Sequence, residues 1–104
     1  MQSHDDYIVV IPARYNSSRL PGKPLIKISG IEMLLRTFNK CNEVVDAKKI
    51  FVATESIKIE EFCISNNLQV VMTSNQCLTG TDRIAEVAKK IDAPVYINVQ
   101  GDEP

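Results

Sequence analysis

The order of apolar and polar residues along the chain indicates four buried strands that alternate with three amphipathic helices. Each expected strand is a short run rich in β-branched residues, which is typical of a strand covered on both faces. The strands are expected at residues 8–11, 49–54, 68–73 and 95–99, and the helices at residues 31–41, 56–66 and 81–91. This alternation predicts βαβ units, and therefore an open, mostly parallel, Rossmann-like α/β sheet with helices on both faces.

Local signals set the expected boundaries of the helices. The Ser29–Gly30 pair precedes the first apolar helical stripe and is expected to mark where that helix starts. Ser56 is expected to cap the second helix, which the Asn66–Asn67 pair should end. Thr81 is the expected N-cap of the third helix, whose pattern Asp92–Pro94 interrupts.

The winding of these units predicts where a ligand binds. If the second and third strands lie on one side of the first, and the fourth on the other, the strand order is 3-2-1-4. In open sheets of this class, ligands bind beyond the carboxyl ends of the strands where the winding reverses. The reversal falls between the first and fourth strands, which run into the segments Pro12–Lys23 and Gln100–Pro104. These two segments are expected to form the walls of one crevice.

The segment that follows the first strand is strongly basic. It contains no acidic residue over positions 7–31, although the whole chain has a net charge of −1. Four cations lie within it: Arg14, Arg19, Lys23 and Lys27. Prolines restrict its backbone, Gly22 permits a turn and Ser17 offers a hydroxyl donor, so the loop suits a nucleotide phosphate. A solvated basic loop is the competing interpretation, because charge clusters are usually surface features.

Two carboxylates, Asp102 and Glu103, follow the fourth strand directly. Carboxylate oxygens are hard ligands of the kind that Mg²⁺ prefers, and this ion completes its octahedron with waters and substrate phosphates. A turn that ends the strand for conformational reasons is the alternative interpretation.

The motif Gly80–Arg83 follows the polar loop after the third strand and has two interpretations. Structurally, it is a loop glycine, a capping threonine and an acidic first turn that complements the helix dipole. Functionally, its exposed N–H groups and the Arg83 side chain would contact a nucleotide or a sugar acid. We expect a mixed role, in which Thr81 caps the helix and Arg83 contacts the ligand.

Composition narrows the possible functions. With 104 residues, of which 44% are hydrophobic, the chain is expected to form one small domain with a modest core. Its nearly balanced charge argues against general nucleic-acid binding. The polar segment at residues 1–6 is expected to be a flexible tail, with neither a signal peptide nor a membrane span. A cytoplasmic protein is therefore expected.

The three cysteines are far apart, and none forms a C-x-x-C pair. This spacing indicates neither a disulfide framework nor a zinc site. Cys41 and Cys63 fall at apolar positions of expected helices and should be buried, whereas Cys77 lies in an expected loop, where it could be exposed. A catalytic thiol is disfavoured because His4, in the tail, is a poor candidate for its base.

Three motifs in sequence order carry a more specific signal than the charge does. They are Pro12-Ala13-Arg14 with Ser17 and Arg19–Leu25, then Gly80–Arg83, then Gln100–Pro104. Together they resemble the signature of the 3-deoxy-manno-octulosonate cytidylyltransferases, the CMP-Kdo synthetases. The resemblance implies a nucleotide-diphospho-sugar transferase type of fold. Because family members are more than twice as long, residues 7–104 are expected to be the N-terminal, nucleotide-binding portion of a truncated cytidylyltransferase domain.

The resemblance also implies roles for individual residues. The implied nucleotide and phosphate contacts come from the loop after the first strand: Pro12, Ala13, Arg14, Ser17, Arg19 and Lys23. The implied catalytic residues are Arg14, Lys23 and Asp102. Gln100 and Arg83 are the implied sugar-binding residues, and Asp102 is the implied ligand of a magnesium cofactor.

The activity implied by the resemblance is transfer of CMP from CTP to 3-deoxy-D-manno-octulosonate (Kdo), giving CMP-Kdo and pyrophosphate for lipopolysaccharide biosynthesis. The expected partners are CTP and Kdo, with a homodimer for the full-length enzyme and with neither nucleic acid nor membrane. A CMP-sialate-like or legionaminate-like synthetase is the nearest alternative. A non-catalytic nucleotide-binding or dimerisation fragment is the alternative from another class, because the chain ends at Pro104.

Overall fold

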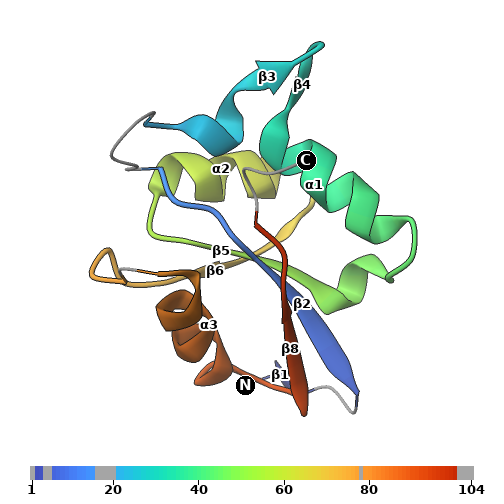
Figure 1. The fold of residues 1–104 in the computed structure, drawn as a ribbon, viewed down its shortest axis with the longest axis vertical. Helices are drawn as coiled ribbons and strands as arrows, with labels where there is room; N and C mark the ends of the chain where they lie inside the picture. The colour runs from blue at the N-terminus through green and yellow to red at the C-terminus, as the bar shows by residue number, and fades with distance from the viewer. Residues whose placement is uncertain (1, 4–5, 16–20, 78, 101–104) are drawn as a thin grey trace.

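A parallel four-stranded sheet forms the centre of the molecule (Figure 1). The computed structural model describes residues 2–3, 6–15, 21–77 and 79–100. Within them the sheet consists of β2 (Tyr7–Pro12), β5 (Ile50–Thr54), β6 (Gln69–Met72) and β8 (Val95–Asn98). Their order is β6-β5-β2-β8, so the predicted order 3-2-1-4 and the parallel α/β class are confirmed.

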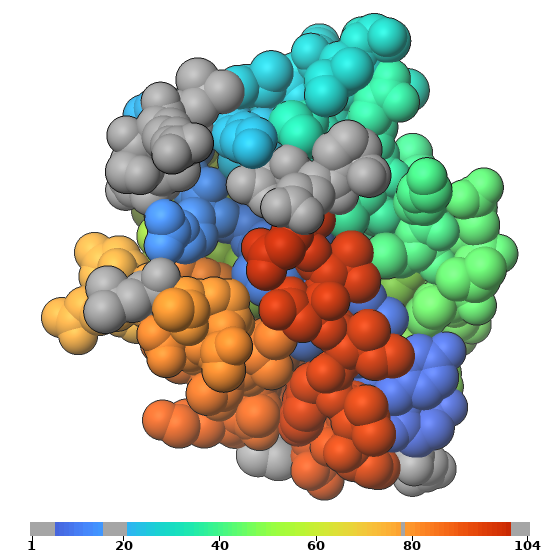
Figure 2. Space-filling model, in the orientation of Figure 1, coloured from blue at the N-terminus to red at the C-terminus, as the bar shows by residue number. Residues whose placement is uncertain are grey.

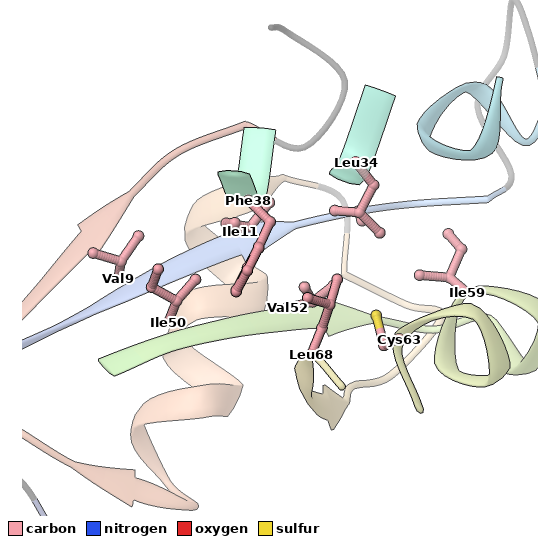
Figure 3. Close-up of a cluster of buried hydrophobic side chains, with 10 residues drawn as sticks. Val9, Ile11, Leu34, Phe38, Ile50, Val52, Ile59, Cys63 and Leu68 are labelled. Carbon is pink, nitrogen blue, oxygen red and sulfur yellow. The ribbon is translucent and has the colours of Figure 1, made fainter. Parts of the chain in front are cut away.

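Three helices cover the two faces of this sheet. They are α1 (Met33–Asn42), α2 (Ile57–Ser65) and α3 (Gly80–Ala88). Alternate residues of β2 face opposite sides, as the pleat of a strand requires. Val9 and Ile11 pack into one core with side chains from α1 and α2 (Figure 3), whereas Ile8 and Val10 pack into a second core with Val87 of α3. Covering on both faces explains why the central strands are apolar at nearly every position.

The helix boundaries follow local hydrogen bonds, and two of them differ from the predictions. The Ser56 hydroxyl accepts the Ile59 N–H at 3.3 Å, which confirms the predicted cap of α2. The predicted cap of α3 is wrong, because Thr79 rather than Thr81 caps that helix. The Thr79 hydroxyl accepts the Asp82 N–H, and the Asp82 carboxylate accepts the Thr79 N–H, which together form a capping box. Gly80 is thus the first residue of the helix and not a loop glycine.

The Ser29–Gly30 pair does not mark the start of a helix. It forms the turn of a small antiparallel hairpin between β3 (Lys27–Ile28) and β4 (Ile31–Glu32). Both residues have positive φ angles, 53° and 84°, which is the backbone of a two-residue primed hairpin turn. The following helix, α1, therefore begins two residues later than the apolar pattern predicts, at Met33.

The remaining short elements connect the larger ones. A 3₁₀ turn, η1 (Lys23–Leu25), follows the basic loop, and a second, η2 (Ala47–Lys49), leads into β5. Within the segment predicted as a tail, β1 (Gln2–Ser3) pairs with β7 (Ile91–Asp92), which the sequence pattern did not indicate. None of the helices described is long and apolar enough to cross a membrane.

Candidate functional site

The carboxyl end of β2 lies between the ends of its two neighbours, as the predicted crevice requires. On one side the Ala13 N–H donates to the Ala53 carbonyl at 2.8 Å. On the other side the Val99 N–H donates to the Val10 carbonyl at 3.0 Å. Pro12 and Ala13 are buried at this junction, and Arg14 is half-buried just beyond it. The sheet therefore brings the start of the basic loop close to the end of β8, although the two are far apart in the sequence.

The N-terminus of α3 completes this region. A Cβ atom built on Gly80 would lie 3.1 Å from Gln100 Nε2, 3.5 Å from Asn98 Nδ2 and 3.6 Å from Pro12 Cγ. The three motifs of the sequence thus meet at one place. In Figure 2 the blue segment after β2 lies near the orange start of α3 and the red end of β8, on one face of the molecule. The absence of a side chain at Gly80 leaves room for both amides.

A small cavity of about 60 Å³ opens beside Arg14. Its lining combines two guanidinium groups with a carboxylate, an amide and a thiol: Arg14, Arg83, Glu55, Asn75 and Cys77. Two arginines beside one cavity favour an anionic or strongly accepting ligand, because guanidinium groups are planar donors that match phosphate and carboxylate oxygens.

Arg83 is almost fully buried, with 1% of its surface exposed. Its Nη1 donates to the Thr73 hydroxyl and, at 3.4 Å, to the Ser74 carbonyl. Its Nε is buried and has no partner among the described residues. A buried donor without an acceptor is costly, so this N–H is left able to donate to a further partner. The geometry gives Arg83 an anchoring role toward Thr73 and Ser74, and its contact with a sugar stays a prediction.

Cys77 is buried, although its expected place in a loop would have allowed it to be exposed. Its thiol donates to Glu86 Oε2 at 2.8 Å. Burial, and then this hydrogen bond, raises the pKa of the Cys77 thiol, while the same bond is the main cause that lowers the pKa of Glu86. A raised pKa leaves little thiolate at neutral pH, so Cys77 is poorly suited to act as a nucleophile. Burial likewise raises the pKa of Cys63, to about 12.

The structure describes both ends of the basic loop. The Gly22 N–H donates to the Tyr15 carbonyl at 2.6 Å, and Gly22 has a φ of 75°, which favours glycine. Lys23 follows at the start of η1 and is half-buried. Three predicted site residues, Ser17, Arg19 and Asp102, lie outside the described residues, as does the neighbouring Glu103. Their contributions to the site therefore remain predictions.

Magnesium binding also remains a prediction. Over residues 2–3, 6–15, 21–77 and 79–100, no group of three or more His, Cys, Asp or Glu side chains is arranged to hold a metal ion. The predicted ligand, Asp102, is not among these residues.

Three residues of the site were not predicted. Glu55 and Asn75 line the cavity, and Asn98 lies beside Gly80. Each is a polar residue within three positions of the carboxyl end of a parallel strand. A search for the polar residues nearest these strand ends would have found them, because such positions gather at one edge of a parallel sheet.

A larger hollow of about 590 Å³ lies elsewhere, beside β6 and the start of β7. Its lining is mostly apolar, with Gln69 and Lys90 as the polar members. Gln69 donates to the Ala47, Lys48 and Ile50 carbonyls, and Lys90 donates to the Met72 carbonyl. Because these side chains already bond the protein backbone, the small cavity beside Arg14 is the better candidate despite its size.

Comparisons with known proteins identify relatives of this chain. A 3-deoxy-manno-octulosonate cytidylyltransferase from Escherichia coli is 43% identical over 97 residues, and one from Marinobacter nauticus is 46% identical over 101 residues. A solved CMP:2-keto-3-deoxy-manno-octonic acid synthetase complexed with CTP superposes with a TM-score of 0.89 at 42% identity. A cytidylyltransferase structure from Leptospira borgpetersenii superposes with a TM-score of 0.79 at 25% identity.

These similarities cover nearly all of this chain but less than half of the other proteins. The Escherichia coli and Marinobacter alignments cover 93% and 94% of this chain and 39% and 38% of the relatives. The two structural alignments each cover 95% of this chain, and 41% and 42% of the other chains. The family model for cytidylyltransferases matches residues 8–104, which include all three motifs. The chain therefore belongs to the cytidylyltransferase family.

Proposed function

We propose that the chain is the nucleotide-binding part of an enzyme that transfers CMP from CTP to Kdo, giving CMP-Kdo and pyrophosphate for lipopolysaccharide biosynthesis. The observation that carries this proposal is the similarity to a synthetase complexed with CTP, together with the meeting of the three motifs beside Gly80. The chain spans about two-fifths of the curated relatives it matches, so the remainder of the active site would come from further residues.

In this reaction the anomeric hydroxyl of the sugar attacks the α-phosphate of CTP. The anomeric hydroxyl loses its proton to water as its oxygen bonds the α-phosphorus, the bond from that phosphorus to the bridging oxygen breaks, and pyrophosphate leaves with its negative charge. Such transfers depend mainly on positioning and charge stabilisation, so no side-chain nucleophile is needed. The inert character of Cys77 is compatible with this chemistry.

The basic loop would neutralise the phosphates. Arg14 borders the cavity at the carboxyl end of β2, and Lys23 follows Gly22 where the loop returns. Arg14, Arg19 and Lys23 would hold the triphosphate and the departing pyrophosphate, and Ser17 would add a hydroxyl donor. Asp102 would hold a magnesium ion, which supplies further neutralisation of charge on the phosphates.

The sugar acid would bind on the β8 side of the crevice. Gln100 lies there, and its amide both donates and accepts hydrogen bonds. Arg83 would complement the carboxylate of the sugar acid, since its Nε has no partner among the described residues. We also propose that the longer enzyme is a cytoplasmic homodimer.

A pyrophosphate-release assay tests the proposal. CTP, magnesium and Kdo would be supplied to this chain and, in parallel, to a version extended to the length of its relatives. ATP, GTP and UTP serve as nucleotide controls, and a sialic acid as the sugar control. We expect turnover with CTP and Kdo by the extended version, and none by the 104-residue chain alone. Absence of pyrophosphate release from every combination would refute the synthetase function.

A further inference from the structure

Tyr15 joins the two ends of the basic loop. Its backbone N–H donates to both carboxylate oxygens of Glu55, at 3.2 Å and 3.3 Å. Its carbonyl accepts the Gly22 N–H at 2.6 Å. The Tyr15 ring also covers Gly22 closely, since a Cβ atom there would lie 3.0 Å from ring atom Cε2. Whatever holds Tyr15 therefore sets where the loop leaves the sheet and where it returns.

Glu55 holds Tyr15 by continuing the sheet with a side chain. The Ala13 N–H bonds the Ala53 carbonyl in the usual parallel register. Two residues further along both strands, the Tyr15 N–H bonds the Glu55 side chain instead of a carbonyl. A side chain reaches further than the backbone, so the loop can diverge from β5 without leaving this N–H unsatisfied. The acceptor is ionised, which makes the hydrogen bond stronger than one between neutral groups.

Glu55 also borders the cavity that Arg14 and Arg83 line, and it is half-buried. A carboxylate beside a site for a polyanion repels the ligand, so its presence needs a compensating benefit. The hydrogen bonds to Tyr15 supply that benefit, because they fix the backbone of the residue next to Arg14. An arginine on a loop fixed at both ends has less conformational freedom to lose when it binds a phosphate.

We propose that Glu55 is a positioning residue for the nucleotide phosphates. It acts through the Tyr15 backbone, which places Arg14 at one end of the basic loop and Gly22–Lys23 at the other. Glu55 itself is expected to touch neither the reacting phosphate nor the sugar. The inference rests on the proposed function, since it assumes that the basic loop binds CTP.

Two substitutions separate the reach of the side chain from its charge. Glu55→Gln keeps an oxygen at the same distance and removes the charge, whereas Glu55→Asp keeps the charge and shortens the reach by one methylene. In the extended enzyme, Glu55→Asp is expected to raise the KM for CTP about tenfold, as loss of a charge-assisted hydrogen bond would. Its kcat should fall by less than about tenfold, far less than on removal of Arg14 itself, because the guanidinium group is still present and only its placement is loosened.

Glu55→Gln is expected to raise the KM for CTP by less than about threefold, since the amide oxygen still accepts the Tyr15 N–H. Glu61→Asp is the matched control on the exposed surface of α2, and it should leave both constants unchanged. Circular dichroism would check that every variant keeps its fold.

Equal KM values for Glu55→Asp and the unsubstituted enzyme would overturn the positioning role and leave the proposed function intact. A larger effect from Glu55→Gln than from Glu55→Asp would also overturn it, because charge rather than reach would then matter. Absence of CTP turnover in the unsubstituted extended enzyme would overturn the proposed function, and this inference with it.

Discussion

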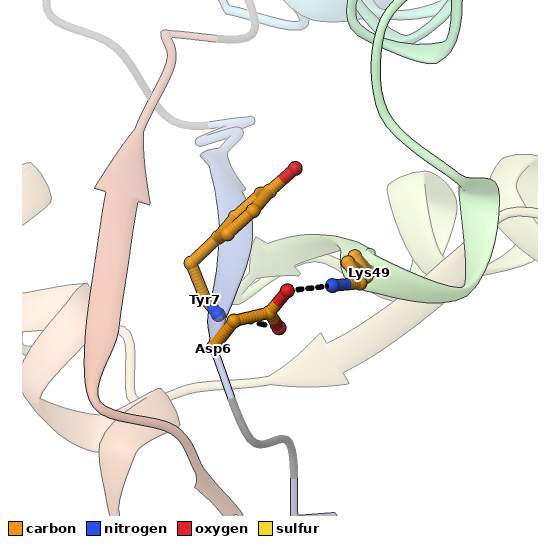
Figure 4. A network of polar contacts seen from close by, with 3 residues as sticks. All are labelled: Asp6, Tyr7 and Lys49. Atoms are coloured by element: carbon orange, nitrogen blue, oxygen red, sulfur yellow. Dashed lines mark hydrogen bonds and ion pairs between the residues drawn. The ribbon is translucent and has the colours of Figure 1, made fainter.

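The two ends of β2 both carry charged residues, and the comparison between them locates the site. At the amino end, the Asp6 carboxylate accepts the Tyr7 N–H at 2.7 Å and pairs with the Lys49 ammonium group (Figure 4). Lys49 also lies over the Tyr7 ring, 4.7 Å from its centroid. At the carboxyl end, Arg14, Glu55 and Arg83 surround a cavity.

The difference is in how the charges are satisfied. The side chains of Lys49 and Asp6 are 28% and 54% exposed, so water and the partner group satisfy them together. Arg83 is buried, and its Nε has no partner among the described residues. Charges that satisfy one another at the surface need no ligand, whereas a buried cation with a donor left over indicates one. We therefore assign the function to the carboxyl end alone.

The largest effect is expected from removing a cation at the carboxyl end. In the extended enzyme, Arg14→Ala should lower turnover of CTP and Kdo by at least about 100-fold, the scale for losing one donor that stabilises transition-state charge. Lys23→Ala should have a comparable effect. Lys27→Ala, an exposed lysine on β3, is the matched control and should retain activity. Near-normal pyrophosphate release by Arg14→Ala would remove that residue from the catalytic group.

A smaller effect is expected from filling the space at Gly80. Gly80→Val would push against the Gln100 and Asn98 amides, and overpacking of this kind typically corresponds to about a tenfold loss in binding or more. Gly80→Ala should be milder, because the nearest atom belongs to the far end of the Gln100 side chain, which can move. Steady-state KM values for CTP and Kdo would measure the effect of each variant. Equal constants for Gly80→Val and the unsubstituted enzyme would show that Gln100 is not confined by this helix.

The cap of α3 predicts a change in stability without a change in chemistry. Thr79→Ala removes the hydroxyl that accepts the Asp82 N–H and should cost about 1 kcal/mol of the free energy of unfolding. Thr81 is the exposed second residue of the helix, so Thr81→Ala should change the free energy of unfolding by less than about 0.5 kcal/mol. Urea denaturation would compare the two. A larger loss of stability from Thr81→Ala than from Thr79→Ala would indicate that Thr81 is the cap.

The smallest effect is expected at the amino end of β2. Asp6→Asn removes the ion pair with Lys49, but both groups are at the surface, so the thermal midpoint at neutral pH should stay within experimental scatter. The Lys49 hydrogen bond lowers the pKa of Asp6, so its small contribution is present above the unfolded pKa and is lost as the pH falls through the folded value. The CTP turnover of the extended enzyme should be unchanged in Asp6→Asn. A loss of CTP turnover in Asp6→Asn would break the contrast between the two ends.

The central strands of the sheet were predictable because strands buried on both faces are apolar at nearly every position, and such runs can be recognised in a short stretch of sequence. The runs at Ile8–Ile11 and Ile50–Thr54 have few polar positions, which only a doubly covered strand tolerates. The order 3-2-1-4 was supposed from the winding of open α/β sheets, and the pairing confirms it. The crevice between β2 and β8 stays a prediction, because the cavity beside Arg14 is lined by residues that follow β2, β5 and β6 and by Arg83 of α3.

The predictions that were wrong concern positions where neighbouring residues, or two local structures, suit the same sequence equally well. Thr79 and Thr81 are both good caps, and the reciprocal bond from Thr79 to Asp82 decides between them. Ser29–Gly30 suits a helix start or a hairpin turn, and pairing of Lys27 with Glu32 decides for the hairpin. The burial of Arg83 and Cys77 depends on packing across the sheet edge, which a single sequence does not encode locally.

The central claim is that ligands bind at the carboxyl end of β2 and nowhere near its amino end. A titration of the ¹⁵N-labelled extended enzyme with CTP, followed by amide chemical shifts, tests it directly. We predict that the shift changes concentrate at Ala13–Tyr15, Gly22–Lys23, Gly80–Arg83 and Gln100, while the amides of Tyr7 and Lys49 stay unchanged. Shifts centred on Tyr7 and Lys49, or no shift at any CTP concentration, would contradict it.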